Sequence, residues 1–212
     1  MGTQPYTVDG KKVPSVTTII GRFKESGALI HWAWTEGKEG RDYRQTRDSA
    51  ASAGTLAHLM VEADIRGTPI PNIADYDGDT WAKASSAFKA YGAWREQTQL
   101  EPDHSETPLT CACHMVGGTL DTILVRGRRA LGDWKTSNAV YQDYLIQLAA
   151  YGHLWTVNHP DMPLEGGFHL LRFSKQAGDF THHFWPALDE ALEAFFLMRR
   201  LYDLDKQLKG RL

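Results

Sequence analysis

The spacing of apolar residues changes near Glu106, and this change constrains the fold of the 212-residue chain more than any other feature. Before Glu106 apolar residues recur at helical spacing, and after it strand-like segments alternate with helical ones. The predicted elements are a hairpin at 6–13, helices at 16–23, 28–36, 54–66 and 80–97, strand-like segments at 106–125 and 129–135, a helix at 139–157, strands at 167–173 and 180–185, and a helix at 187–208. This order indicates an α/β or α+β fold with a mixed central sheet flanked by helices.

One domain is expected over residues 1–212, because no internal repeat or Gly/Ser-rich linker divides the chain. Residues 1–100 should form a mainly helical N-terminal part. Residues 105–185 should hold the catalytic sheet with its helix, and residues 187–212 should form the C-terminal helix.

Composition excludes several classes of protein. Hydrophobic residues make up 42% and charged residues 23%, which is typical of a soluble globular chain rather than a disordered one. No apolar run approaches the roughly 20 residues of a membrane helix, so no membrane partner is expected. The first residues lack the apolar segment of a secretory signal. A cytoplasmic protein is therefore expected.

The two cysteines and the net charge give little indication of which metals or partners the chain binds. Cys111 and Cys113 are too few for a disulfide framework or a four-thiolate cluster. Zinc is a weak alternative here, because no second ligand pair follows, and packing in a strand is the favoured role. The net charge of −3 argues mildly against nucleic-acid binding, although Arg199, Arg200 and the basic segment 206–211 could contact phosphates.

Two aspartates and a lysine in adjacent strands form the strongest chemical signal. If the connecting loop is the three residues 126–128, Asp121 lies directly opposite Asp133 and both side chains share one face. Lys135, two residues beyond Asp133, projects from the same face. A two-residue loop would instead send the carboxylates to opposite faces. The length of this turn therefore decides whether a site exists.

Two opposed carboxylates repel each other and favour a bound cation. Oxygen ligands of this kind suit Mg²⁺ or Mn²⁺. A metal that polarises a phosphate, together with a nearby lysine, is fit for phosphodiester hydrolysis. By spacing alone, a solvent-exposed charge cluster on a hairpin explains the same residues equally well.

Two predicted helices supply further candidates. His58 and Glu62 are four residues apart and share a helical face, with Glu62 expected to be a surface charge. Gln147 and Tyr151 have the same spacing in the helix at 139–157. An amide on an otherwise apolar face needs a hydrogen-bonding partner, so we expect Gln147 to have one.

Four segments, in this order, resemble the PD-(D/E)XK nuclease superfamily in its RecB-like exonuclease branch: GTLAH (54–58), GTLD (118–121), GDWKTS (132–137) and QLAAY (147–151). The segment PSVTTII (14–20), followed by Trp32 and Trp34, is similar to phage-type members and to the related mitochondrial genome maintenance exonuclease. The resemblance covers about residues 5–155 and implies a restriction-endonuclease-like core. Leu120 stands where the superfamily name has proline, which is usual in this branch.

The resemblance implies a Mg²⁺- or Mn²⁺-dependent DNA exonuclease acting on single strands or DNA ends. It assigns catalysis to Asp121, Asp133 and Lys135, metal binding to His58, Asp121, Asp133 and the Trp134 carbonyl, and DNA contact to Gln147 and Tyr151. The iron–sulfur cluster of several relatives in this branch cannot form with two cysteines. Glu106 is favoured as a plain edge-strand charge rather than an outer ligand.

The resemblance further implies DNA as the partner, with a single-strand annealing protein or a helicase beside it. The expected setting is phage or bacterial DNA recombination, repair or replication, in the host cytoplasm if the chain is phage-encoded. Two alternatives stay open: a structure-selective endonuclease on the same fold, and a catalytically idle DNA-binding module.

Overall fold

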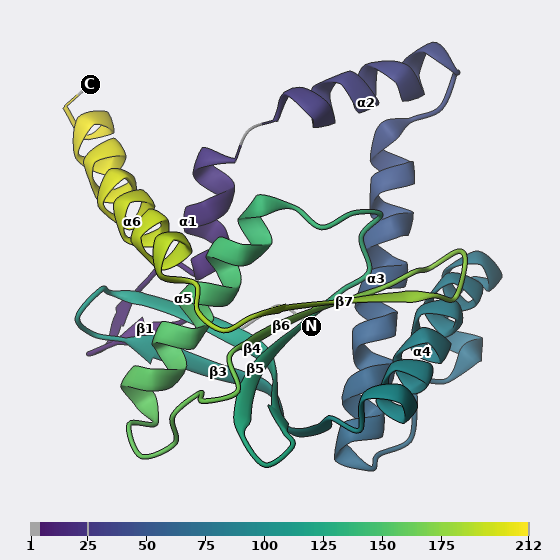
Figure 1. Cartoon of the computed structure of the whole chain (residues 1–212). Coiled ribbons are helices and arrows are strands. Elements are labelled where there is room, and N and C mark those ends of the chain that lie inside the picture. The colour runs from purple at the N-terminus through teal and green to yellow at the C-terminus, as the bar shows by residue number, and fades with distance from the viewer. Residues whose placement is uncertain (1–4, 25, 212) are drawn as a thin grey trace.

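The computed structural model describes residues 5–24 and 26–211, which form a five-stranded sheet covered by helices on both faces (Figure 1). Residues 1–4, 25 and 212 of the expected domain lie outside this description. The elements are β1 Thr7–Val8, β2 Lys11–Lys12, α1 Val16–Phe23, α2 Gly27–Lys38, α3 Tyr43–Arg66, a 3₁₀ turn Ile73–Asp75, α4 Gly78–Thr98, β3 Glu101–Cys111, β4 Val116–Val125, β5 Arg129–Lys135, α5 Gln142–Asn158, β6 Phe168–Phe173, β7 Phe180–Trp185 and α6 Asp189–Lys209. The predicted α+β class is confirmed.

The main sheet has the strand order β3-β4-β5-β6-β7. Neighbouring strands are antiparallel except β5 and β6, which are parallel. A parallel pair needs a long crossover, and α5 supplies it between these two strands. The prediction of a mixed central sheet is therefore confirmed.

The strand-like segment 106–125 is two strands rather than one. β3 begins at Glu101, earlier than the expected boundary at 105, and the turn 112–115 joins it to β4. Met115 closes this turn with a φ of +46°. The two strands pair antiparallel, so β3 becomes the edge of the sheet and carries Glu106 alongside β4.

Helices lie on both faces of the sheet (Figure 1), and each face carries an apolar core. On one face, α1, α5 and α6 pack around fully buried Trp155 and Phe195. On the other face, α3 and α4 pack around Trp94 and Trp134, whose ring centroids lie 5.2 Å apart. Aromatic side chains of this size bury large apolar areas and hold both layers against the sheet.

The helices begin and end at residues that suit those positions. Ser15 caps α1, since its Oγ accepts a hydrogen bond from the Thr18 N–H at 3.0 Å. Asp42 caps α3, and Gly67 ends that helix in the left-handed conformation. Within the described residues, no helix is both long enough and apolar enough to cross a membrane.

Candidate metal centre

The turn between β4 and β5 has the length on which the site depends. Val125 pairs with Arg129 across a three-residue loop, and Thr122 pairs with Gly132 further along the ladder. The next step of the same register sets Asp121 opposite Asp133. Gly127 has a φ of +74° in this loop, a conformation that favours glycine. The predicted three-residue loop is confirmed.

Asp133 lies at the centre of the sheet and is fully buried. Its Oδ2 is 2.5 Å from the Lys135 ammonium, which projects from the same strand two residues later. The Lys135 Nζ also lies 5.1 Å from the ring centroid of Tyr144 on α5. Apart from this ion pair, neither Asp133 oxygen accepts a hydrogen bond from the part of the chain that the structure describes.

Asp121 is also buried, and it bridges two strands. Its Oδ2 accepts a hydrogen bond from the Trp134 N–H at 2.7 Å. This bond orients one carboxylate oxygen and leaves the other available. The Trp134 indole packs into the α3–α4 core, and a role for its carbonyl stays a prediction.

His58 and Glu106 complete the cluster from two further elements. The His58 Nδ1 on α3 lies 4.0 Å from Glu106 Oε1 on β3. His58, Glu106 and Asp121 each offer one ligand atom within 4.8 Å of the others. The sequence favoured Glu106 as a plain edge-strand charge. In the structure its carboxylate instead lies close to His58 and Asp121.

A close approach of α3 to Thr136, the residue after β5, accompanies the approach of His58 to the sheet. Gly54 lies one turn before His58, and a Cβ at this position would lie 2.9 Å from Thr136 Oγ1. A larger residue would force the helix away from the end of β5. The glycine in GTLAH thus has a steric role, because it lets α3 approach closely enough for His58 to reach Asp121.

Gln147 and Tyr151 lie on α5 and bond to each other. The Gln147 Nε2 donates to the Tyr151 hydroxyl at 3.0 Å, which confirms that this amide has a partner. Tyr151 is buried and packs on Gly118, where an added Cβ would lie 2.6 Å from its ring. The pair therefore stands next to the strand that carries Asp121.

Burial and crowding shift the pKa values of the cluster. Burial raises the pKa of Asp133 to about 6, with Asp121 adding to the rise and Lys135 opposing it. Burial and Glu106 also raise the pKa of Asp121, against the opposing charges of His58 and Lys135. The carboxylates thus favour an additional positive charge when they are ionised.

Burial acts on the pKa values of the two basic groups in the opposite direction, but the neighbouring carboxylates outweigh it. Burial alone would lower the pKa of Lys135, but Asp133 and Asp121 outweigh it and raise that pKa. Burial would likewise lower the pKa of His58, while Glu106 and Asp121 raise it. Lys135 is therefore an ammonium at neutral pH.

The donor set fits a divalent cation. The carboxylates of Glu106 and Asp121 converge with the His58 imidazole, and Asp133 lies opposite Asp121, buried and with few hydrogen-bond donors. Carboxylate oxygens with a single nitrogen suit Mg²⁺ and Mn²⁺ better than softer ions. His58, Glu106, Asp121 and Asp133 are the residues that would hold the ion.

A pocket of about 330 Å³ opens beside the cluster, and its walls include His58, Lys135, Thr136, Tyr144 and Lys175. The Lys175 ammonium donates to the Ala50 carbonyl at 3.1 Å across the opening. A second hollow of about 400 Å³, along α3 near Leu59, contains none of the cluster residues.

Other candidates do not join the cluster. Glu62 forms an ion pair with Arg66 at 2.5 Å and is a surface charge, as expected. Arg199 is 11% exposed and binds Asp203 and the His114 carbonyl, so it is not free to contact phosphates. His182 on β7 is half-buried, and its Nε2 lies 2.7 Å from His169 Nδ1.

A comparison with models of known protein families finds no match, and a comparison with curated proteins finds no significant similarity.

Proposed function

We propose that this chain is a metal-dependent DNA exonuclease of the PD-(D/E)XK type, which hydrolyses phosphodiester bonds in single strands or at DNA ends. The observation that carries the proposal is the convergence of Asp121, Asp133 and Lys135 on one face of adjacent strands. His58 and Glu106 add two further ligand atoms from α3 and β3.

The chemistry follows from the donor set. When bound, Mg²⁺ or Mn²⁺ would polarise the scissile phosphate and lower the pKa of a water molecule. Lys135 is charged at neutral pH, so it serves as a hydrogen-bond donor to phosphate oxygen rather than as a base. Its ion pair with Asp133 holds the ammonium at the edge of the pocket.

The surroundings of the pocket suit a nucleic-acid strand. Lys135 and Lys175 place two cations in its walls, and Tyr144 adds an aromatic ring. Lysines bind the phosphate backbone, while aromatic rings stack on bases without strong sequence preference. Gln147 and Tyr151, which bond to each other on α5, are proposed to contact the DNA backbone.

The test uses end-labelled linear DNA and closed circular DNA of the same sequence, each with Mg²⁺ or Mn²⁺. An exonuclease degrades the linear form and spares the circle. Cleavage of circles would move the assignment to a structure-selective endonuclease on the same fold. Binding of DNA without cleavage of either form would indicate an idle DNA-binding module and overturn the proposal.

Two variants assign any activity to the site. Asp133→Asn removes the central carboxylate charge with little change in shape. Glu62→Gln is the matched control, because Glu62 lies on the same helix as His58 and forms an ion pair with Arg66 outside the cluster. Activity that survives in Asp133→Asn would come from a contaminating nuclease or from another site.

A further inference from the structure

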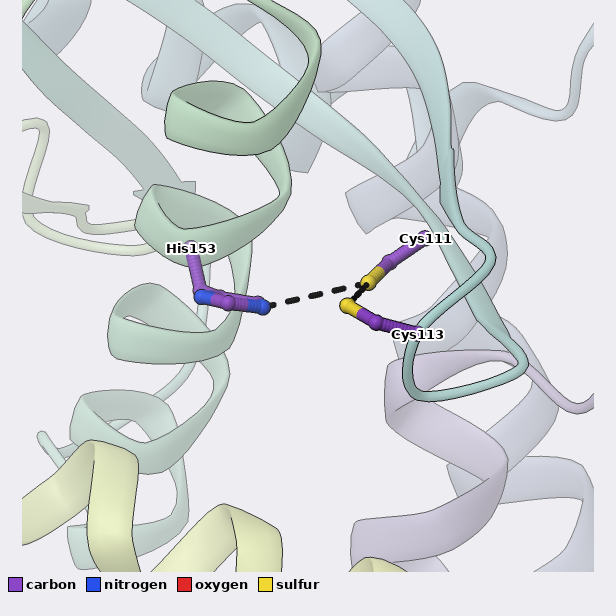
Figure 2. A group of neighbouring side chains, drawn as sticks. All are labelled: Cys111, Cys113 and His153. Carbon is purple, nitrogen blue, oxygen red and sulfur yellow. Dashed lines mark hydrogen bonds between the residues drawn. The ribbon is translucent and has the colours of Figure 1, made fainter. Parts of the chain in front are cut away.

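A second group of metal-ligating side chains lies at the far end of β3. The Sγ atoms of Cys111 and Cys113 are 2.6 Å apart, and His153 Nε2 lies 3.9 Å from the Cys111 sulfur. All three donor atoms lie within 4.8 Å of one another. Figure 2 shows the His153 ring pointing from α5 toward the two sulfurs at the hairpin turn.

We propose that Cys111, Cys113 and His153 form a zinc site. Two thiolates and one imidazole are donors that select zinc over Mg²⁺ or Mn²⁺. Binding would release the two thiol protons, so the two thiolate charges balance the charge of the ion. Water is the expected fourth ligand, because Cys113 is exposed and this side of the group faces solvent.

The surroundings of the donors favour this role. Burial and Cys113 raise the pKa of the Cys111 thiol, while the backbone N–H groups of His114 and Cys113 lower it by favouring the thiolate. Burial and the neighbouring His114 lower the pKa of His153. The imidazole is therefore neutral at pH 7 and has a lone pair available for a metal.

Zinc, with Zn–S bonds of about 2.3 Å, would move the two sulfurs apart from 2.6 Å to about 3.8 Å, through rotation of the exposed Cys113 side chain. A disulfide would instead bring them to about 2.05 Å, and it accounts for fewer of the three donors. It would use both sulfurs and leave His153 without a polar partner, since Cys111 is the one such partner that residues 5–24 and 26–211 provide. Zinc uses all three donors. His114 lies beside the group with its ring stacked on Phe196 at 4.3 Å, so it supports the site from outside.

Zinc here would tie the turn 112–115 to α5. Arg199 on α6 already holds this turn through the His114 carbonyl at 2.8 Å. A metal would add a second anchor from a different helix. This link between the hairpin and the helix does not depend on the proposed nuclease activity.

The test is a titration of the metal-free, reduced full-length chain with Co²⁺, followed by displacement with Zn²⁺. Cobalt bound by thiolates gives a charge-transfer band in the near ultraviolet, whereas cobalt at His58 and Asp121 does not. One equivalent of Co²⁺ should produce the band, and Zn²⁺ should abolish it. Cys111→Ser and Cys113→Ser should lose it, and His153→Gln should weaken affinity by at least about tenfold.

Matched controls separate this site from others. Ala112→Ser changes the same turn but keeps both thiols, and His183→Gln removes a half-buried histidine from β7. Both variants and Asp121→Asn should keep the band. Absence of the band in the reduced wild type, or equal affinity in His153→Gln, would overturn the proposal. A Cys111–Cys113 disulfide that persists under reductant would overturn it as well.

Discussion

Glu106 on β3 lies opposite Asp121 on β4, and its backbone is left-handed there, with a φ of +49°. The neighbouring pairs Ser105 with Thr122 and Thr107 with Leu120 fix this position. A left-handed conformation is uncommon for glutamate, costs about 1 kcal/mol or more, and tends to occur at functional sites. Three acidic positions, Glu106, Asp121 and Asp133, therefore form one row across three adjacent strands.

The first prediction concerns this strained residue. Glu106→Gln should weaken Mn²⁺ binding by about 10- to 100-fold, because it removes one oxygen ligand's charge. Glu106→Gly should weaken binding similarly, yet stabilise the metal-free protein by about 1 kcal/mol through relief of the left-handed strain. Calorimetric titration and urea unfolding measure the two effects. Wild-type affinity in both variants would remove Glu106 from the ligand set.

The second prediction concerns the buried ion pair. Lys135→Ala should abolish cleavage and also destabilise the metal-free fold by roughly 3–5 kcal/mol, because Asp133 keeps its buried charge without a partner. Mg²⁺ should restore part of this loss. Chemical denaturation with and without Mg²⁺ checks this, and Lys175→Ala serves as a lysine control at the pocket wall. An unchanged free energy of unfolding in Lys135→Ala would show that the ion pair between Lys135 and Asp133 does not stabilise the fold.

The third prediction concerns pH. A carboxyl whose pKa is raised to about 6 on folding contributes stability at low pH and loses it as the pH rises through 6. The metal-free protein should therefore lose this contribution between about pH 4, the pKa of the unfolded carboxyl, and about pH 6. The Mg²⁺-induced rise in melting temperature should be small near pH 5 and larger near pH 7.5, because protons then no longer compete for Asp133. A metal-induced shift that does not change with pH would contradict ligation by Asp133.

The fourth prediction compares metals. Mg²⁺ should raise the free energy of unfolding by RT ln(1 + [L]/Kd), which is about 2.7 kcal/mol at a hundredfold excess over Kd. The melting temperature should rise accordingly. Mn²⁺ should serve as well or better, because imidazole is a better ligand for it. Ca²⁺ should bind yet support little cleavage, since its coordination is looser. In Asp121→Ala these shifts should disappear, and equal shifts in both proteins would place the ion elsewhere.

The sequence alone predicted the parts of the site that depend on which side chains share a face of a strand, because side chains alternate between the two faces. The three-residue loop at 126–128 sets which side chains share a face, so Asp121 and Asp133 could be paired from sequence alone. Ser15 as a helix cap and the partner of Gln147 follow from equally local arguments. Each of these depends on neighbours within a few residues or one turn.

Contacts between distant segments could not be predicted in this way. The register of Glu106 depends on the length of the turn 112–115, which the sequence does not fix. His153 lies on a separate helix, so its approach to Cys111 depends on how α5 packs against the hairpin. Gly54 gave a partial signal, since a glycine within a helix often marks close packing.

The most direct measurement of the central claim is single-turnover hydrolysis of end-labelled linear DNA by wild type, Asp133→Asn and Glu62→Gln. The wild type and Glu62→Gln should cleave with Mg²⁺ and stop when the metal is chelated. Asp133→Asn should be slower by at least about a thousandfold, which corresponds to a loss of about 4 kcal/mol in transition-state stabilisation. Wild-type cleavage by Asp133→Asn, or cleavage by the wild type that persists without divalent metal, would contradict the account.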